Sequence, residues 1–180
     1  LCYRDFGKTP YIISLRGSDV PNYNVRLGLD YKLLSGLFKK IWRNAAAVAA
    51  NSKGLAQLAN EFMPELGIGV ISNGIYMDRF FPAEKHGIKK PVRLLTVCRL
   101  ISRKRIDLLI EVVAELKQSG IEVLLSIAGE GNLMEDLKSF AEELGVGQQV
   151  NFMGRIAVED MPGVYRDNDI FVMSSSHEGM

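Results

Sequence analysis

The sequence predicts an α/β protein made of two Rossmann-like domains (the parallel-sheet type with helices on both faces), both of them incomplete. Short apolar runs typical of buried strands alternate with amphipathic helical patterns along the whole chain, a rhythm typical of parallel sheets. The rhythm lapses once, in a stretch with two prolines and a glycine. We therefore expect residues 1–75 to be the later part of one domain, 76–91 to be a linker, and 92–180 to be the early part of a second domain.

In the first half, a strand is expected from Pro10 to Leu15 and a helix from Asp30 to Arg43. The apolar stripe of this helix consists of Leu33, Leu34, Leu37, Phe38, Ile41 and Trp42. "AAVAANS" predicts a short buried strand, and Ser52 at its end is a preferred N-cap for a helix through Phe62. "IGVISNG" predicts another strand that ends in a polar turn.

In the second half, "VRLLTVC" predicts a strand, and the helix after it has one apolar stripe. That stripe consists of Ile106, Leu109, Ile110, Val113 and Leu116. "VLLSIAG" predicts the next strand, and Asn132 with Glu135 resembles a capping box at the start of the next helix. "VNFMG", a short helix near Glu159 to Arg166, and "IFVMSSS" complete the pattern.

The composition excludes several classes of protein. With 47% hydrophobic and 24% charged residues in 180, the chain is an ordinary α/β protein, and its net charge of +1 gives no reason to expect nucleic acid as a partner. Cys2 and Cys98 lie far apart, so neither a disulfide framework nor a four-cysteine zinc site is expected. No apolar run reaches the roughly 18 residues of a membrane span, and no signal peptide is recognisable. A reducing, cytoplasmic location is the simplest interpretation.

The two ends of the sequence predict an internal fragment of a longer protein. The chain opens at Leu1 without an initiator Met, and it closes at Met180 directly after a strand-like run. A strand of a doubly wound sheet is normally followed by a crossover helix. We expect the 180-residue chain by itself to be inactive and poorly stable, because missing elements would leave apolar faces uncovered.

Candidate ligand-binding residues follow the predicted strands, because ligands of such sheets bind beyond the carboxyl ends of the strands. In the first half these residues are Arg16, Gly17, Asp19, Asn51, Ser52, Asn73 and Gly74. In the second half they are Arg99, Gly129, Glu130, Gly131, Gly154, Arg155, His177, Glu178 and Gly179. Nearly all are polar or glycine, so we expect an anionic or hydroxyl-rich ligand in a crevice between the domains.

The most specific local pattern is "RLISRKR", in which Arg99 ends a strand and Lys104 lies where the next helix is expected to begin. A loop of this length can bring both cations toward one point, and the helix N-terminus adds partial positive charge there. A close pair of opposite charges is worth up to about 4 kcal/mol at an effective dielectric of about 20, so a diphosphate between the cations would stabilise the arrangement. The alternative is a solvated basic turn, since Arg103 and Arg105 look like surface residues.

Each of the other candidates also has an ordinary structural explanation. Glu178 alone is more often an exposed loop acid, and Gly129 is needed for a strand-to-helix turn with or without a ligand. Asn73 and Gly74 form a common turn pair. The basic helix face of Lys32, Lys39, Lys40 and Arg43 is expected to be solvated, with peripheral contact to an anionic membrane surface as a second possibility.

The ordered set of motifs resembles the retaining, nucleotide-sugar-dependent glycosyltransferases of family 4, which have two Rossmann-like domains (the GT-B fold). "TVCRLISRKRIDLLIEV", "LSIAGEGNLMEDLKSFAEELGV", "VNFMGRI" and "DIFVMSSSHEGM" carry the resemblance. Upstream, "SLRGSDVP", "VAANSKGL" and "VISNGIYMDRFFP" fit the stretch before the interdomain linker of the family. The resemblance implies that residues 1–75 are on the acceptor side and residues 92–180 on the donor side.

The resemblance also implies roles for individual residues. Arg99 and Lys104 match the cations that bind the donor diphosphate and stabilise the leaving nucleoside diphosphate. Glu178 matches the first glutamate of the paired-glutamate motif, near the hydroxyls of the donor sugar, and its partner would lie beyond Met180. Gly179 would let the donor approach the backbone.

Two further segments match the family with differences. The turn Met153–Arg155 resembles the segment that receives the nucleotide base. "RGSD" matches a loop that often carries His where Arg16 stands, and this loop would hold donor phosphate or acceptor. In the family, the lysine that matches Lys104 is usually followed by Gly. In this chain Arg105 follows it, which would matter little if Arg105 points outward.

The resemblance implies a hexosyltransferase of polysaccharide or glycolipid biosynthesis that retains anomeric configuration and needs neither a cofactor nor a metal. The usual proposal is front-face attack, in which an oxygen of the leaving phosphate helps to deprotonate the acceptor. "DND" at Asp167–Asp169 superficially matches the metal-binding Asp-x-Asp of other transferases, but it is expected to end a helix.

Alternatives remain open at this point. One is another sugar-nucleotide enzyme of the same fold, such as a phosphorylase or an epimerase, and another is a non-catalytic binding module. The expected partners are a nucleotide-sugar donor and a sugar, lipid-linked or small-molecule acceptor. The donor sugar, base, acceptor and oligomeric state are not determined by the sequence.

Overall fold

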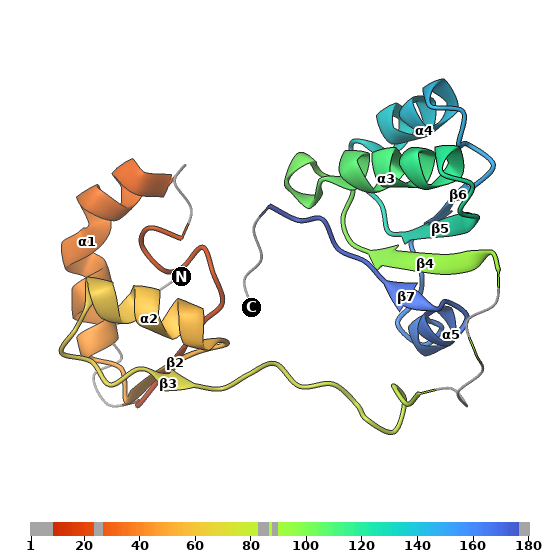
Figure 1. Cartoon of the computed structure of the whole chain (residues 1–180). Coiled ribbons are helices and arrows are strands. Elements are labelled where there is room, and N and C mark those ends of the chain that lie inside the picture. Colours follow the sequence, from red (N-terminus) through yellow and green to blue (C-terminus); the bar gives the residue numbers. More distant parts are fainter. Residues whose placement is uncertain (1–8, 24–26, 83–86, 88–89, 177–180) are drawn as a thin grey trace. The chain divides into compact units, whose positions relative to one another are not determined.

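The computed structural model describes residues 9–23, 27–82, 87 and 90–176. The chain divides into two compact units, with the boundary between Gly74 and Ile75 (Figure 1). We call the part up to Gly74 the first unit and the described part from Ile75 to Ser176 the second unit. Both contain parallel sheets with helices in the connections, which confirms the predicted α/β class.

The first unit contains a three-stranded parallel sheet in the order β1-β2-β3. Its elements are β1 (Ile12–Leu15), α1 (Gly28–Arg43), β2 (Ala47–Ala50), α2 (Lys53–Phe62) and β3 (Gly69–Val70). In the register, Leu15 of β1 pairs with Ala50, and Ala50 pairs with Val70 of β3. The predicted cap is confirmed, because the Ser52 hydroxyl accepts a hydrogen bond from the Leu55 N–H at 3.2 Å.

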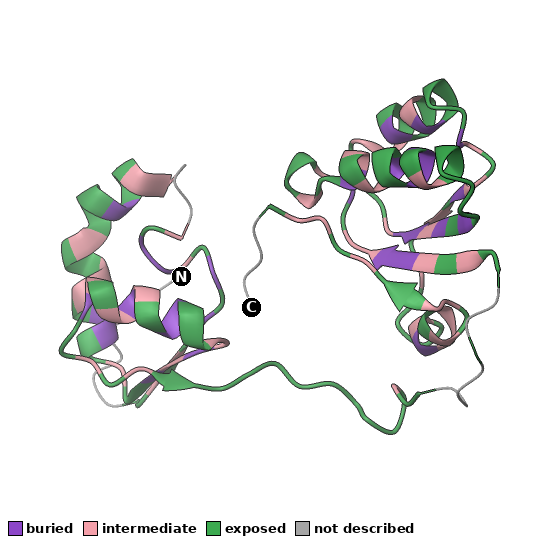
Figure 2. Ribbon diagram, viewed as in Figure 1, coloured by how far each residue is buried: buried purple, intermediate pink, exposed green. Residues whose placement is uncertain are grey.

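The predicted apolar stripe of α1 is buried only at its C-terminal end. Ile41 and Trp42 lie in the core, where the Trp42 ring meets the Phe62 ring edge-on at 5.5 Å. Leu33 and Leu37 of the same stripe are 83% and 52% exposed. Most of the α1 ribbon is coloured as exposed or intermediate (Figure 2). The pattern predicts the helix correctly, but Leu33, Leu34 and Leu37 on that face remain exposed.

The second unit contains a four-stranded parallel sheet in the order β6-β5-β4-β7. The strands are β4 (Val92–Val97), β5 (Val123–Ala128), β6 (Val150–Gly154) and β7 (Ile170–Phe171). The helices are α3 (Ile106–Gln118), α4 (Met134–Glu143) and α5 (Met161–Arg166), and a single 3-10 helical turn, Ser102–Lys104, precedes α3. β7 is much shorter than the run "IFVMSSS" predicts, because only its first two residues pair with β4.

The core of the second unit lies between its sheet and α3 and α4. Ile110 of α3 and Ile127 of β5 are fully buried, and Leu137 of α4 is packed against them in the same cluster. The predicted capping box of α4 is wrong. The helix begins at Met134 with Leu133, not Asn132, as its N-cap residue, and no side chain caps it. The Leu133 N–H bonds to the Leu100 carbonyl at 3.2 Å. Glu135 forms an ion pair with Lys138 at 2.8 Å.

An extended segment follows β3. Every residue from Ile71 to Arg79 is exposed, and Asn73–Gly74 lies in extended chain rather than in the predicted turn. The next residues are anchored on the second unit. The Phe80 ring meets the Tyr165 ring at 6.0 Å, and the Arg166 guanidinium lies 4.7 Å from the centre of the Phe81 ring. None of the helices in the described ranges has the length and apolar content that a membrane crossing requires.

Candidate functional site

The carboxyl edge of the second sheet collects the described candidate residues of the second half of the chain. Val97 of β4 pairs with Ala128 of β5, and Ala128 pairs with Gly154 of β6, so the three strands end at the same level. The candidates that follow these ends are Arg99, Gly129, Gly154 and Arg155. The structure therefore places residues that are up to 56 positions apart in the sequence at one edge, as parallel strands require (155 − 99 = 56).

Arg99 is held by its neighbours on both sides. The Cys98 N–H bonds to the Ala128 carbonyl at 3.0 Å, and the Leu100 N–H bonds to the Glu130 carbonyl at 2.9 Å, so pairing with the β5 loop continues beyond the strands. Leu100 is fully buried, whereas Arg99 is exposed. The backbone of Arg99 is thus fixed while its guanidinium faces outward at the edge of the sheet.

The glycines of the β5 loop are required by this close pairing. A Cβ at Gly129 would lie 1.8 Å from the Cys98 carbonyl oxygen, and a Cβ at Gly131 would lie 2.1 Å from that of Leu100. Gly129 also has φ of +138° and donates its N–H to the Gly154 carbonyl at 2.7 Å. Backbone packing therefore explains both glycines without a ligand.

Lys104 lies in the 3-10 turn and not at the start of the next helix. Its N–H bonds to the Ile101 carbonyl at 2.9 Å, and α3 begins only at Ile106. Arg105, between them, adopts the left-handed conformation with φ of +48°. Its guanidinium forms an exposed ion pair with Asp107 at 2.9 Å, which confirms that Arg105 points outward.

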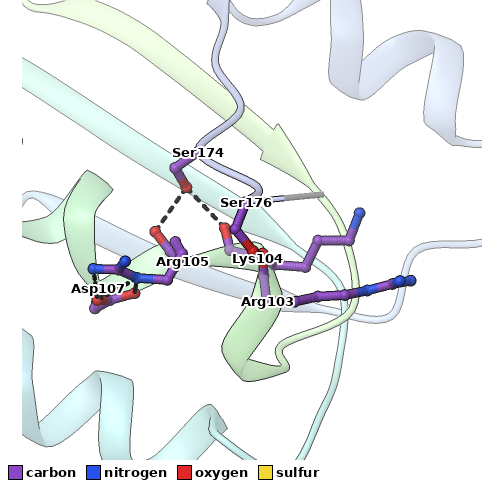
Figure 3. Close-up of polar contacts among 6 residues, drawn as sticks. All are labelled: Arg103, Lys104, Arg105, Asp107, Ser174 and Ser176. Atoms are coloured by element: carbon purple, nitrogen blue, oxygen red, sulfur yellow. Dashed lines mark hydrogen bonds and ion pairs between the residues drawn. The ribbon is translucent and has the colours of Figure 1, made fainter. Parts of the chain in front are cut away.

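The segment after β7 is tied to this turn (Figure 3). The Ser174 hydroxyl lies 2.8 Å from the Lys104 carbonyl oxygen and 2.7 Å from that of Arg105. Ser176 donates to the Arg103 carbonyl from its N–H at 2.9 Å and from its hydroxyl at 3.1 Å. In the same view the side chains of Arg103 and Lys104 extend away from Arg105 and Asp107.

Neither of these two serines is among the residues that the sequence predicts for the site. A run of three serines after a strand-like stretch is a signal of polar contacts, but it does not name partners 70 positions away. Glu178 and Gly179, two of the predicted site residues, lie outside the described residues together with His177. Met153 is half-buried on β6, and Arg155 after it is exposed.

In the first unit, the loop after β1 is held by its own carboxylate. Asp19 accepts hydrogen bonds from the N–H of Arg16 at 2.9 Å and from that of Gly17 at 2.7 Å. The hydroxyl of Tyr31 donates to the Ser18 carbonyl, and burial, followed by the charges of Asp19 and Asp30, raises the pKa of Tyr31. Asp19 thus shapes the loop, and the Arg16 side chain is exposed.

Asn73 is not brought to this loop by any described contact, since it lies exposed in the extended segment. "DND" does not form a metal site either. Asp167 is the C-cap of α5, and the Asp169 carboxylate accepts bonds from the Arg93 N–H at 2.8 Å and its guanidinium at 3.2 Å. In the described ranges no group of three or more His, Cys, Asp or Glu side chains could hold a metal ion.

The model of the family "Glycosyl transferases group 1" matches residues 78–180. This is more than half of the chain and includes the whole carboxyl edge of the second sheet. The chain belongs to this family.

Two curated glycosyltransferases are similar in sequence to the chain. The chain is 29% identical over 132 residues to the GDP-mannose-dependent alpha-(1-6)-phosphatidylinositol monomannoside mannosyltransferase of Mycolicibacterium smegmatis, covering 69% of the chain and 35% of that protein. It is 31% identical over 167 residues to the lipopolysaccharide core biosynthesis glycosyltransferase LpsE of Rhizobium meliloti, covering 88% of the chain and 46% of that protein. The chain thus spans between about a third and a half of the length of these relatives.

Among solved structures, Anabaena HepE in complex with UDP and glucose superposes with a TM-score of 0.73 at 20% identity, covering 94% of the chain and 47% of HepE. At this identity the likeness shows the fold alone. It is the two-domain GT-B fold of glycosyltransferases, as the sequence predicts.

Proposed function

We propose that the protein transfers a sugar from a nucleoside-diphosphate sugar to an acceptor hydroxyl group, with retention of anomeric configuration and without a metal ion. Membership of the glycosyltransferase family and the named activities of the relatives support this class of reaction. The observation that carries the proposal is the anchored loop from Arg99 to Arg105, which holds two cations that match the family pattern at the carboxyl edge of the sheet.

In this proposal Arg99 and Lys104 bind the diphosphate. Cations on one short loop repel each other, and an anion between them removes that repulsion. The first N–H groups of α3 add partial positive charge at the end of the same loop. Together they stabilise the negative charge that develops on the departing diphosphate, which is the task that a metal ion performs in other transferases.

The chemical step is a substitution at the anomeric carbon. The bond from that carbon to the diphosphate oxygen breaks, and the acceptor oxygen forms its bond on the same face. The acceptor proton passes to an oxygen of the leaving phosphate. We assign Glu178 to the hydroxyls of the donor sugar and the backbone of Met153–Arg155 to the base, and we assign Gly129 and Gly179 to close approach of the donor.

The loop of the first unit is assigned to the donor phosphate or the acceptor. Asp19 would act by shaping this loop, because its carboxylate is engaged with the N–H groups of Arg16 and Gly17. The exposed guanidinium of Arg16 is the group that would reach the ligand, and Asn73 would be a further polar contact.

The named relatives also suggest the acceptor class. One acts on a phosphatidylinositol mannoside and another in lipopolysaccharide core biosynthesis. We infer a sugar or lipid-linked acceptor in glycolipid or polysaccharide synthesis, and a cytoplasmic site of action with peripheral contact at the inner membrane face. The donor base is the first property to establish, since one relative is GDP-mannose-dependent and HepE is described with UDP.

The test is calorimetric titration of UDP and GDP into the full-length protein and its Lys104→Ala variant. We expect micromolar binding of one nucleotide and at least a tenfold loss, about 1.4 kcal/mol, in the variant. Lys138→Ala is the matched control, because Lys138 is an exposed lysine of α4 that pairs with Glu135. Binding of neither nucleotide, or equal binding by wild type and Lys104→Ala, would contradict the proposal.

A further inference from the structure

The 3-10 turn that carries Lys104 has carbonyl groups that need partners from elsewhere. The last carbonyls of any helical segment lack partners within the segment. Here the chain turns left-handed at Arg105 directly after the turn, so α3 does not simply continue it. No described N–H of this turn or of α3 bonds to the carbonyls of Arg103 and Lys104, whereas the Arg105 carbonyl accepts the Leu108 N–H at 3.2 Å.

The serines after β7 supply those partners. Ser176 bonds to the Arg103 carbonyl through both its N–H and its hydroxyl, at 2.9 and 3.1 Å. The Ser174 hydroxyl has one proton and lies within 2.8 Å of both the Lys104 and the Arg105 carbonyl oxygens, so it bridges the two peptide groups. All three successive carbonyls thus accept hydrogen bonds from one segment 69 or more positions away (Figure 3).

These contacts fix the peptide groups on both sides of Lys104. The peptide before it contains the Arg103 carbonyl, and the peptide after it contains its own carbonyl. The direction of a side chain follows from these two planes. The left-handed backbone conformation of Arg105 also costs free energy and persists only when the surrounding structure stabilises it. The hydrogen bonds of Ser174 to the Lys104 and Arg105 carbonyls provide that stabilisation.

We propose that Ser174 and Ser176 are positioning residues that aim Lys104 by capping its turn, and that nucleotide affinity depends on them although neither contacts the nucleotide. The inference rests on the proposed function only for its binding readout. The coupling between the serines and the turn is a separate claim about the chain itself.

The binding test is a double-mutant cycle in the full-length protein, titrated with whichever of UDP and GDP the wild type binds. We expect Ser174→Ala to weaken binding about three- to tenfold, as loss of a hydrogen bond of ordinary strength would. In a Lys104→Ala background, Ser174→Ala should not weaken nucleotide binding further, because the ammonium group that Ser174 positions is absent. Ser174→Thr should restore affinity, since it keeps the hydroxyl, and Ser139→Ala on the exposed side of α4 should leave affinity unchanged.

The outcomes separate positioning from simple structural support. Equal weakening by Ser174→Ala with and without Lys104 would overturn the proposal, as would unchanged affinity in Ser174→Ala. If Ser174→Ala does not fold, Ser176→Ala is the milder variant, because the Ser176 N–H bond to Arg103 remains.

Hydrogen exchange separates failure of this inference from failure of the proposed function. We expect Ser174→Ala to speed amide exchange in a peptide covering residues 101–108 and to leave α4 unchanged. If wild type binds neither nucleotide, the proposed function fails. Exchange then still decides the coupling: faster exchange supports it and unchanged exchange overturns it.

Discussion

The loops after β1 and β4 each present an exposed arginine just beyond the end of a strand, but they are held in different ways. The loop of the first unit is braced locally, by the Asp19 carboxylate on the N–H groups of Arg16 and Gly17. The loop of the second unit is braced from a distance, by the backbone after β5 and by the serines after β7. A locally braced loop depends on residues within a few positions, whereas a loop braced from a distance depends on the whole sheet edge.

This comparison can be tested because each unit carries its own probe. Trp42, the only tryptophan in the sequence, lies in the core of the first unit. Cys98 is a half-buried thiol of the second unit, and a Cys2→Ser background leaves it as the single thiol of these 180 residues. Trp42 fluorescence in urea and the rate of Cys98 labelling therefore report the two units separately.

The largest effect is expected from Gly129→Ala. Its Cβ would lie 1.8 Å from the Cys98 carbonyl oxygen, so the pairing of the β4 and β5 loops must break. We expect a loss of at least about 3 kcal/mol in the second unit, seen as Cys98 labelling faster by on the order of a hundredfold. The Trp42 transition should not move.

Gly120→Ala is the matched control for Gly129→Ala. Gly120 also has a positive φ, +72°, but a Cβ there meets no atom within 4 Å. The conformational strain alone should cost about 1 kcal/mol. Equal effects of the two variants would show that the close approach to Cys98 does not matter.

Asp19→Ala should give an intermediate effect confined to the first unit. It removes the acceptor of the Arg16 and Gly17 N–H groups, which costs about 1–3 kcal/mol where those groups are partly buried. The Trp42 transition should shift to lower urea while Cys98 labelling is unchanged. Asp30→Ala, an exposed acid in the first turn of α1, should shift the transition by no more than about 0.5 kcal/mol. A changed rate of Cys98 labelling in Asp19→Ala would show that the loop of the first unit is not stabilised by local contacts alone.

The smallest effects are expected from one ion pair in each unit. Hydrogen bonds from Arg93 hold the pKa of Asp169 below its usual value, and a hydrogen bond from Arg43 likewise lowers the pKa of Glu65. A lowered pKa in the folded state gives stability that is complete above the ordinary carboxyl pKa, about 4, and is lost as the pH falls through the folded value. The fall in Tm between pH 7 and pH 3 should therefore be smaller in Asp169→Asn than in wild type.

Glu65→Gln should change that fall in Tm less than Asp169→Asn does. The Asp169 side chain is 15% exposed and also accepts the Arg93 backbone N–H, whereas that of Glu65 is 50% exposed. Scanning calorimetry between pH 3 and pH 7 measures both variants. A larger effect of Glu65→Gln would reverse the ranking of the two pairs.

The comparison of the loops also explains what the sequence could predict. The strands of the second unit follow from runs of branched apolar residues, and the α2 cap follows from Ser52, because these signals are local. The placement of Arg99 beside Gly129 follows from the general rule that parallel strands end at one edge. Asp19 in the loop "RGSD" is a local signal too, since its carboxylate lies within three positions of the groups that it caps.

What failed or was missed depends on distant partners. The capping box at Asn132 is wrong because the helix starts one residue later, with Leu133 as its N-cap residue and the Leu133 N–H bonded to the distant Leu100 carbonyl. The contacts of Ser174 and Ser176 span 69 or more positions, and no periodicity marks them. The exposure of Leu33 likewise depends on what packs against α1, which the helical pattern does not contain.

The exposed segment from Ile71 to Arg79 has a consequence for how this chain can change over time. No side chain there is buried, so residues can be added or removed at little cost to either hydrophobic core. Insertions and deletions in this stretch would escape selection for folding and be selected only through tasks that need both units together. Its length is therefore a variable that evolution can adjust separately from the two cores.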